Sequence, residues 1–324
     1  MFSVIIPLHN KERYIEKAVR SVLEQTFREF ELIVIDDGST DKSRQRLDSI
    51  SDPRLRVISQ PNTGVSIARN RGVDLANYSL IAFLDADDWW HPDFLKELDT
   101  LVADYPDAVL YGSNYYYVKH GQNRLEYKGL EPDFTVGYID YVAIYAASFC
   151  VPINCSFVVV RESAFNAVKG FKPSLRMGED FDLWIRLALL GKVAYVNKPL
   201  AYSNQDVDVT QRAIGGSKLY PPQAHVTFNL SFLKPAEEKS PALKKLTDGL
   251  RVRSLLPYYL SGQYREPVKK VLKEVNFAHQ PVLYRLLYRL PSQLINLYFR
   301  AQRVGAAAKQ AIADFRRKRL ALVR

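Results

Sequence analysis

The chain has 324 residues, enough for one large domain or two unequal ones, and 47% apolar and 25% charged residues are typical of a globular protein. Two cysteines, Cys150 and Cys155, exclude a disulfide scaffold and make no zinc pattern, so we expect reduced thiols and a cytoplasmic location. No signal peptide is recognised, and no apolar run of about 18 residues could span a membrane. The net charge of +10 is informative only once it is located.

Strand-like and helix-like segments alternate over the first hundred residues. Strands are expected at four apolar runs, 3–7, 31–35, 55–59 and 80–84. Helices are expected between and after them, at 13–25, 65–76 and 92–104. Continuously apolar strands separated by helices indicate a parallel sheet covered on both faces.

The second part of the chain has a more mixed pattern. Further strands are expected at 109–118 and 155–160, and helices at 162–169 and 181–190. From about residue 216 the character changes to helical patterns rich in Lys, Arg, Leu and Tyr. We therefore predict a first domain at 1–215 and a helical C-terminal region at 216–324.

Polar clusters follow three of the predicted parallel strands: residues 7–10, 36–39 and 85–88. Ligands of such sheets bind beyond the carboxyl ends of the strands, so we expect these clusters to meet on one rim. Aspartates at positions i and i+2, such as Asp85 and Asp87, can turn oxygens toward one hard divalent ion such as Mg²⁺. An acidic, solvated turn is the alternative.

Two further motifs suggest chemistry. Glu179 and Asp180 stand at a predicted helix start, where they are either a capping cluster or a general base. Arg69 follows a Gly turn and is either a diphosphate ligand or part of a solvated helix face. Asp36 and Asp37 end an apolar strand and either begin a plain turn or accept hydrogen bonds from a pyrimidine or a ribose.

Taken together, these motifs resemble the family 2 glycosyltransferases, inverting enzymes of the GT-A fold. The resemblance covers about residues 1–210 and is carried by Ser3–Pro7 with Asn10, Glu31–Asp41, Asn62–Gly64, Ala68–Gly72, Phe83–Asp88 and Glu179–Trp184. It implies an α/β, Rossmann-like GT-A fold with a mostly parallel sheet and flanking helices. Residues 202–206 depart from the family pattern because they lack the histidine that many relatives carry there.

The resemblance also implies roles for individual residues. Asp180, or else Glu179, would deprotonate the acceptor hydroxyl, while Asp87 with Asp85 would hold a divalent cation, Mn²⁺ or Mg²⁺. A nucleotide-sugar, with uracil the expected base, would lie against a set of residues from all the motifs: Pro7, His9, Asn10, Asp36, Asp37, Gly38, Asn62, Gly64, Arg69, Asp85 and Ala86.

The implied activity is transfer of a sugar, hexosyl or N-acetylhexosaminyl, from a UDP-sugar to a glycan or lipid-linked saccharide in surface polysaccharide synthesis. The alternatives are a sugar nucleotidyltransferase and a non-catalytic nucleotide-sugar binding module of the same fold.

The positive charge lies mostly in residues 282–324, which hold ten Lys and Arg residues and one acid, Asp314. Leu283, Leu286, Leu287 and Leu290 fall at helical spacing, alternating with Arg285 and Arg289. Such a helix suits an anionic membrane surface, which would bring the protein to the inner face of the membrane. A helix packed on the body, with a solvated basic end, is the alternative. Binding of nucleic acid is not expected, because no fold with stacking aromatics accompanies the charge.

Overall fold

The computed structural model describes residues 1–126, 129–208, 218–291 and 293–295. The chain forms two compact units, residues 1–246 and 247–324. The predicted boundary at 215/216 falls within 209–217, outside the described residues, and stays a prediction. None of the helices within the described ranges combines the length and apolarity needed to cross a bilayer.

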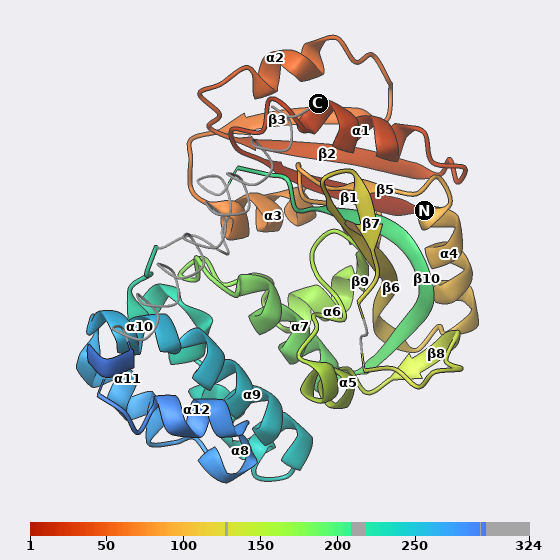
Figure 1. The fold of residues 1–324 in the computed structure, drawn as a ribbon. Coiled ribbons are helices and arrows are strands. Elements are labelled where there is room, and N and C mark those ends of the chain that lie inside the picture. The colour runs from red at the N-terminus through yellow and green to blue at the C-terminus, as the bar shows by residue number, and fades with distance from the viewer. Residues whose placement is uncertain (127–128, 209–217, 292, 296–324) are drawn as a thin grey trace, which may run out of the picture. The chain divides into compact units, whose positions relative to one another are not determined.

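The first unit is built on a mixed sheet in which strands follow the order β3-β2-β1-β4-β9-β6-β10-β5, with β7 on β6 and β8 on β10 (Figure 1). The strands are β1 (Phe2–Leu8), β2 (Phe30–Asp37), β3 (Leu55–Gln60), β4 (Leu80–Phe83), β5 (Trp89–Trp90), β6 (Ala108–Lys119), β7 (Gln122–Arg124), β8 (Val136–Ile139), β9 (Val158–Arg161) and β10 (Lys192–Asn204).

Strands β3, β2, β1 and β4 are parallel, as the apolar runs predicted. β9 runs antiparallel to both β4 and β6, while β6 and β10 are parallel to each other. The Rossmann-like α/β prediction is therefore confirmed for the parallel half, and the other half contains antiparallel pairs that periodicity alone does not reveal.

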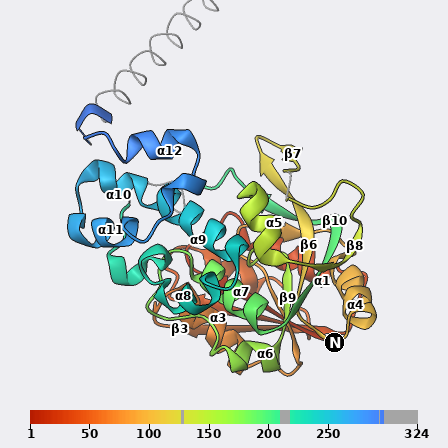
Figure 2. The same cartoon turned by 90° about the horizontal axis from the view of Figure 1, so that it is seen from below.

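Helices cover both faces of this sheet (Figures 1 and 2). On one face α1 and α4 pack against alternate side chains of the strands, such as Val4 and Ala82. On the other face Phe83 meets the rings of Phe171 and Trp184, at centroid distances of 5.4 and 6.4 Å. The helices of this unit are α1 (Ile15–Leu23), α2 (Ser43–Asp48), α3 (Val65–Asp74), α4 (Phe94–Asp104), α5 (Tyr141–Ser148), α6 (Glu162–Ala167), α7 (Glu179–Leu190) and α8 (Lys234–Glu237).

The described residues of the second unit form helices, in agreement with the helical C-terminal region of the predicted fold. Helix α9 (Pro241–Ser254) crosses the boundary between the units, and α10 (Leu256–Ser261), α11 (Arg265–Leu272) and α12 (Val282–Leu287) follow it. Within the second unit, buried Arg251 forms an ion pair with Asp248 at 3.2 Å. Asp248 also accepts a hydrogen bond from the backbone N–H of Asn276, which fastens the segment after α11 to α9.

Candidate active site

The loops that follow β1, β2 and β4 meet at one edge of the sheet, because the three strands are parallel neighbours. Beyond this edge lies a cavity of about 680 Å³. Most of the predicted site residues line this cavity: Pro7, His9, Asp37, Arg69, Asp85, Ala86, Asp87, Glu179 and Asp180.

Arg69 on α3 connects the two halves of the cavity. Its side chain is only 4% exposed and forms ion pairs with Asp85 at 2.7 Å and with Glu179 at 3.2 Å. Asp85 follows β4 and Glu179 begins α7, so one buried guanidinium fixes the first aspartate of the Asp85–Asp88 cluster beside the start of α7. A charge buried this deeply is tolerated only when it is paired, and both carboxylates satisfy this requirement.

Asp87 is also held by a cation. The Lys11 ammonium lies 2.7 Å from its Oδ2 atom, and the Lys11 backbone N–H donates to Ser43 Oγ at 2.7 Å, which fixes the loop after β1. Lys11 lines the cavity, although the sequence motifs did not single it out. The Lys11 ammonium therefore lies next to the place where a metal cation held by Asp87 would bind an anionic ligand.

Asp180 differs from its neighbours, because its carboxylate has no ion-pair partner among the described residues. It accepts a hydrogen bond from the backbone N–H of the next residue, Phe181, at 2.7 Å. Burial, together with the charge of Glu179, raises the pKa of Asp180 to about 6. A carboxylate with this pKa is able to accept a proton near neutral pH.

Asp88 is buried and stabilises the loops at this edge of the sheet. Its Oδ1 atom accepts a hydrogen bond from the backbone N–H of Asn204 at 2.7 Å, which ties the loop after β4 to the end of β10. Burial raises the pKa of Asp88 well above the ordinary aspartate range, and the charges of Asp87 and Asp85 act in the same direction.

Asp37 organises the loop after β3. Its two carboxylate oxygens accept hydrogen bonds from Gln60 Nε2, from Thr63 N–H and Oγ1, and from Gly64 N–H, at 2.7–3.0 Å. Burial alone would raise the pKa of Asp37, but these hydrogen bonds outweigh it and the pKa is lowered.

The remaining predicted residues do not line the cavity. Asn10 Oδ1 accepts from Thr40 N–H at 2.8 Å, and Asp36 Oδ1 accepts from Ser39 N–H at 3.1 Å. Gly38, Asn62 and Gly64 form the supporting turns: a Cβ at Gly38 would lie 2.8 Å from the Asn62 backbone nitrogen, and both glycines have positive φ. The sequence motifs therefore combine residues that face the cavity with residues that shape its loops.

Other cavity residues were not predicted. They come from β6, from the loop before β9 and from the end of β10, namely Tyr117, Val151, Asn154, Ser203, Asn204, Gln205 and Val207. The residues 203–205 occupy the stretch where a histidine was missing from the family pattern. Their arrival at this rim depends on β10 pairing with β6, which no local sequence signal reveals.

Comparison with known proteins agrees with this geometry. Residues 3–157 match the family described as "Glycosyl transferase family 2", and this segment contains β1–β4, Asp37, Arg69 and the Asp85–Asp88 cluster. Residues 3–157 belong to glycosyl transferase family 2.

Relatives of this family 2 domain include glycosyltransferase GlyA of Streptococcus pneumoniae, 31% identical over 210 residues, and chondroitin synthase of Escherichia coli, 29% identical over 201 residues. Each alignment covers 61% of this chain but only 30% and 28% of the relative, so the chain spans less than a third of their length. Among solved structures, S. aureus TarS 1–349 in complex with UDP-GlcNAc has a TM-score of 0.68 at 19% identity, covering 86% of this chain and 82% of TarS 1–349. This likeness confirms the GT-A fold.

Replacement of Asp37 by asparagine tests the role of this carboxylate in the glycosyltransferase domain. We expect Asp37→Asn to lower the free energy of unfolding by about 1–3 kcal/mol at pH 7, because hydrogen bonds to a charged acceptor are lost. Since the folded-state pKa is lowered, this stabilisation is present above the unfolded pKa of about 3.9 and is lost as the pH falls below it. Urea denaturation at pH 7 and pH 3.5 measures both effects. The exposed Asp74→Asn is the control, and equal stability of Asp37→Asn and wild type at pH 7 would contradict the role.

Proposed function

We propose that the domain transfers a sugar, hexosyl or N-acetylhexosaminyl, from a UDP-sugar to an acceptor hydroxyl with inversion of the anomeric carbon. The observation that carries the proposal is a single cavity that holds Asp37, the pair Asp85 and Asp87, and Asp180. These groups can respectively support a nucleoside, a diphosphate with its cation, and a proton transfer. S. aureus TarS was solved in complex with UDP-GlcNAc, and this supports a UDP-sugar as donor here.

We assign the base to Asp180 rather than Glu179. Glu179 is engaged by Arg69 at 3.2 Å, so its carboxylate is less available to the acceptor hydroxyl. Asp180 lines the same cavity without a cation partner among the described residues, and burial has raised its pKa. When Asp180 removes the proton of the acceptor hydroxyl, the hydroxyl oxygen becomes a stronger nucleophile. A single displacement by this oxygen at the anomeric carbon inverts the configuration without a covalent sugar–enzyme adduct.

The diphosphate side of the cavity fits a divalent cation, Mn²⁺ or Mg²⁺. Within the described ranges no three His, Cys, Asp or Glu side chains gather into a protein-only metal cage. Asp85 and Asp87 nevertheless both line the cavity, and Mg²⁺ commonly takes one or two carboxylates and completes its shell with water and phosphate. When bound, such a cation offsets negative charge on the diphosphate. Among the described residues, Lys11 and Arg69 line this part of the cavity as cations.

The acceptor is proposed to be a glycan or a lipid-linked saccharide of surface polysaccharide synthesis. One of the relatives is a chondroitin synthase, whose name identifies a polysaccharide product, and this supports the acceptor class. A membrane-bound acceptor agrees with α12, whose outer face is apolar: Leu283 and Leu286 are 62% and 52% exposed. Leu287, by contrast, is buried in the described structure, so α12 carries apolar side chains on two sides.

Substitution of Asp87 tests the proposed transfer. A panel of UDP-sugars is assayed for hydrolysis and transfer with Mn²⁺ or Mg²⁺, and UDP binding is titrated calorimetrically. We expect Asp87→Ala to fold normally and to lose about 100-fold or more in rate, because charge on the leaving diphosphate is no longer offset. Asp104→Ala, an exposed aspartate at the end of α4, is the control.

The same protein, assayed with two sets of substrates, separates the alternatives. UDP binding without hydrolysis or transfer of any UDP-sugar would favour a binding module. Release of diphosphate from a nucleoside triphosphate and a sugar phosphate would favour a nucleotidyltransferase. A folded Asp87→Ala protein with full activity would exclude the assignment of Asp87.

The pH profile tests Asp180. A base must be deprotonated, so we expect kcat/KM to rise with pH, to half-maximum near the raised pKa of about 6, and to level off above it. Below this pKa the slope is about tenfold per pH unit. The rising limb is expected to disappear in the residual activity of Asp180→Asn and to persist in Asp104→Ala. If kcat/KM of the wild type instead reached half-maximum near pH 4, the base would be a carboxylate with an ordinary pKa.

Docking of the C-terminal region on anionic lipid is tested with the full chain. We expect co-sedimentation with vesicles of phosphatidylcholine and 30% phosphatidylserine, and weaker binding at high salt, because each basic residue near such a surface contributes about 1 kcal/mol. Leu283→Glu with Leu286→Glu is expected to abolish binding, whereas Leu189→Glu, at an exposed leucine of α7, is not. The basic residues within 296–324 lie outside the described residues. Unchanged binding of the double variant would contradict docking through α12 at the cytoplasmic face of the membrane.

A further inference from the structure

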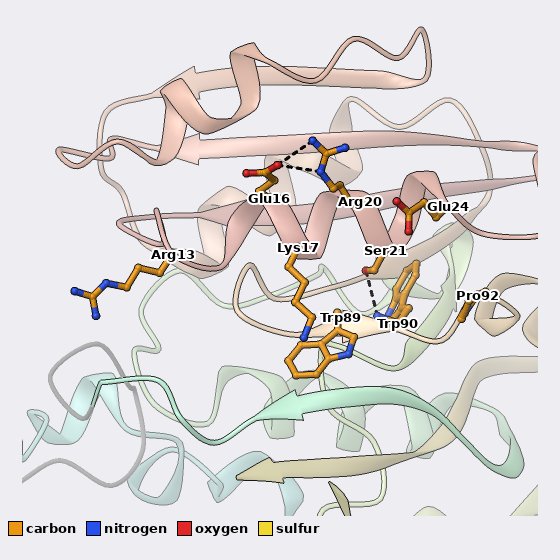
Figure 3. A pocket seen from close by; sticks show the side chains of 9 residues that line it. All are labelled: Arg13, Glu16, Lys17, Arg20, Ser21, Glu24, Trp89, Trp90 and Pro92. Carbon is orange, nitrogen blue, oxygen red and sulfur yellow. Dashed lines mark hydrogen bonds and ion pairs between the residues drawn. The ribbon is translucent and has the colours of Figure 1, made fainter. Parts of the chain in front are cut away.

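A groove leads away from the candidate active site toward α1. The active-site cavity shares Asp87, Asp88 and Asn204 with a second hollow of about 410 Å³. This second hollow shares Arg13, Lys17 and Trp89 with a third one of about 520 Å³, which runs along α1 (Figure 3). Because each hollow shares its lining residues with the next, the three adjoin in a row that begins at Asp87.

Basic side chains mark the far part of this groove. Arg13, Lys17 and Arg20 follow each other at helical spacing, so they project from one side of α1 and the turn before it. Arg20 is already engaged, since it donates to Glu16 Oε1 at 2.8 and 3.0 Å. For Arg13 and Lys17, no carboxylate of the described residues lies within ion-pair distance. Two cations in this groove are therefore available to an external anion.

Trp89 provides the aromatic surface of the groove. The Lys17 side chain reaches over its ring (Figure 3), and the ammonium lies 2.9 Å from the ring centroid. Tyr202 stacks on the same indole at a centroid distance of 5.4 Å. Trp90 and Trp184 are buried, whereas Trp89 is half-buried. An anion that drew the ammonium of Lys17 toward itself would uncover part of the indole for an apolar ring face.

The chemical mixture favours one class of ligand. Cations beside a flat indole suit a sugar ring that carries a negative group, and the carboxylate of Glu24 at the far end can accept hydrogen bonds from hydroxyls. A densely charged polyanion such as nucleic acid fits less well, because Glu16 and Glu24 belong to the same wall.

We propose that this groove is a subsite for an anionic glycan, the acceptor chain or its product, whose carboxylate or phosphate binds Lys17 and Arg13 and whose sugar ring packs on Trp89. This inference rests on the proposed function, since the glycan is placed by the continuity of the groove with the cavity that holds Asp87 and Asp180. It adds a specificity for charge that the donor site does not supply.

The test measures binding to the full chain by calorimetry and by tryptophan emission. The probes are a tetrasaccharide of alternating glucuronic acid and N-acetylglucosamine, its carboxyl-reduced neutral counterpart, and a glycerol phosphate oligomer. We expect at least one anionic probe to bind and to change the emission, and the neutral tetrasaccharide to bind about tenfold more weakly. Trp89→Phe is expected to remove the emission change.

Substitutions on α1 localise the effect. We expect Lys17→Gln and Arg13→Gln each to weaken binding of the anionic probe about fivefold, as for loss of one partly exposed ion pair. Lys17→Arg keeps the charge and is expected to retain binding, and Lys96→Gln, an exposed lysine on α4, is the matched control. In transfer assays Lys17→Gln is expected to raise the KM for the glycan while the affinity for UDP stays unchanged.

The outcomes separate this inference from the proposed function. Preference for the uronate or for the phosphate probe identifies the anion, and either supports the subsite. Equal affinity for the charged and neutral tetrasaccharides, wild-type affinity of Lys17→Gln, or no binding of any probe by a protein that binds UDP would overturn the subsite alone. Glycan binding by a protein that fails to bind UDP would contradict the proposed function and leave the groove in place.

Discussion

The pairing of one buried arginine with two carboxylates is the interaction on which the candidate active site depends. Arg69 belongs to α3, Asp85 follows β4 and Glu179 begins α7, so their ion pairs connect three elements that are distant in sequence. A buried guanidinium without partners is strongly destabilising, and the same holds for a carboxylate that loses its cation. The arrangement is thus stable only as a set. Its consequence is that the diphosphate side and the base side of the cavity are held at a fixed separation by the fold itself.

This pairing also explains how neighbouring acids acquire different properties. Asp85 and Glu179 share Arg69, and Asp87 is paired with Lys11, whereas Asp180 accepts a backbone hydrogen bond and has no cation partner among the described residues. Burial therefore acts on Asp180 without a compensating cation in direct contact, and its pKa rises. The carboxylates of this site therefore differ in their roles because, among the described residues, some of them are paired with Lys or Arg and Asp180 is not, and not because of their residue type.

The sequence predicted the features that depend on local pattern. The four parallel strands are continuous apolar runs, and the polar loops after β1, β2 and β4 meet because parallel strands end on the same rim. It did not reveal β10, whose apolar pattern is interrupted at Asn197–Pro199; the structure accommodates this interruption by shifts of register against β6 on either side of Pro199. Lys11 and Asn204 were missed for a related reason. Their partners, Asp87 and Asp88, lie 76 and 116 residues away in the chain, and only the folded sheet brings them together.

The adjacent pair Asp36 and Asp37 shows why a motif cannot be assigned to one role as a whole. Successive residues of a strand face opposite sides, so only one of the two lines the cavity. Asp36 closes the turn into residue 39, while Asp37 gathers the loop at 60–64 around its own carboxylate. A ligand at this rim would therefore meet a carboxylate that is already oriented and kept ionised by backbone N–H groups. The two carboxylate oxygens of Asp37 thus both order the loop at 60–64 and face the ligand, so a substitution of Asp37 changes the loop and the recognition of the ligand together.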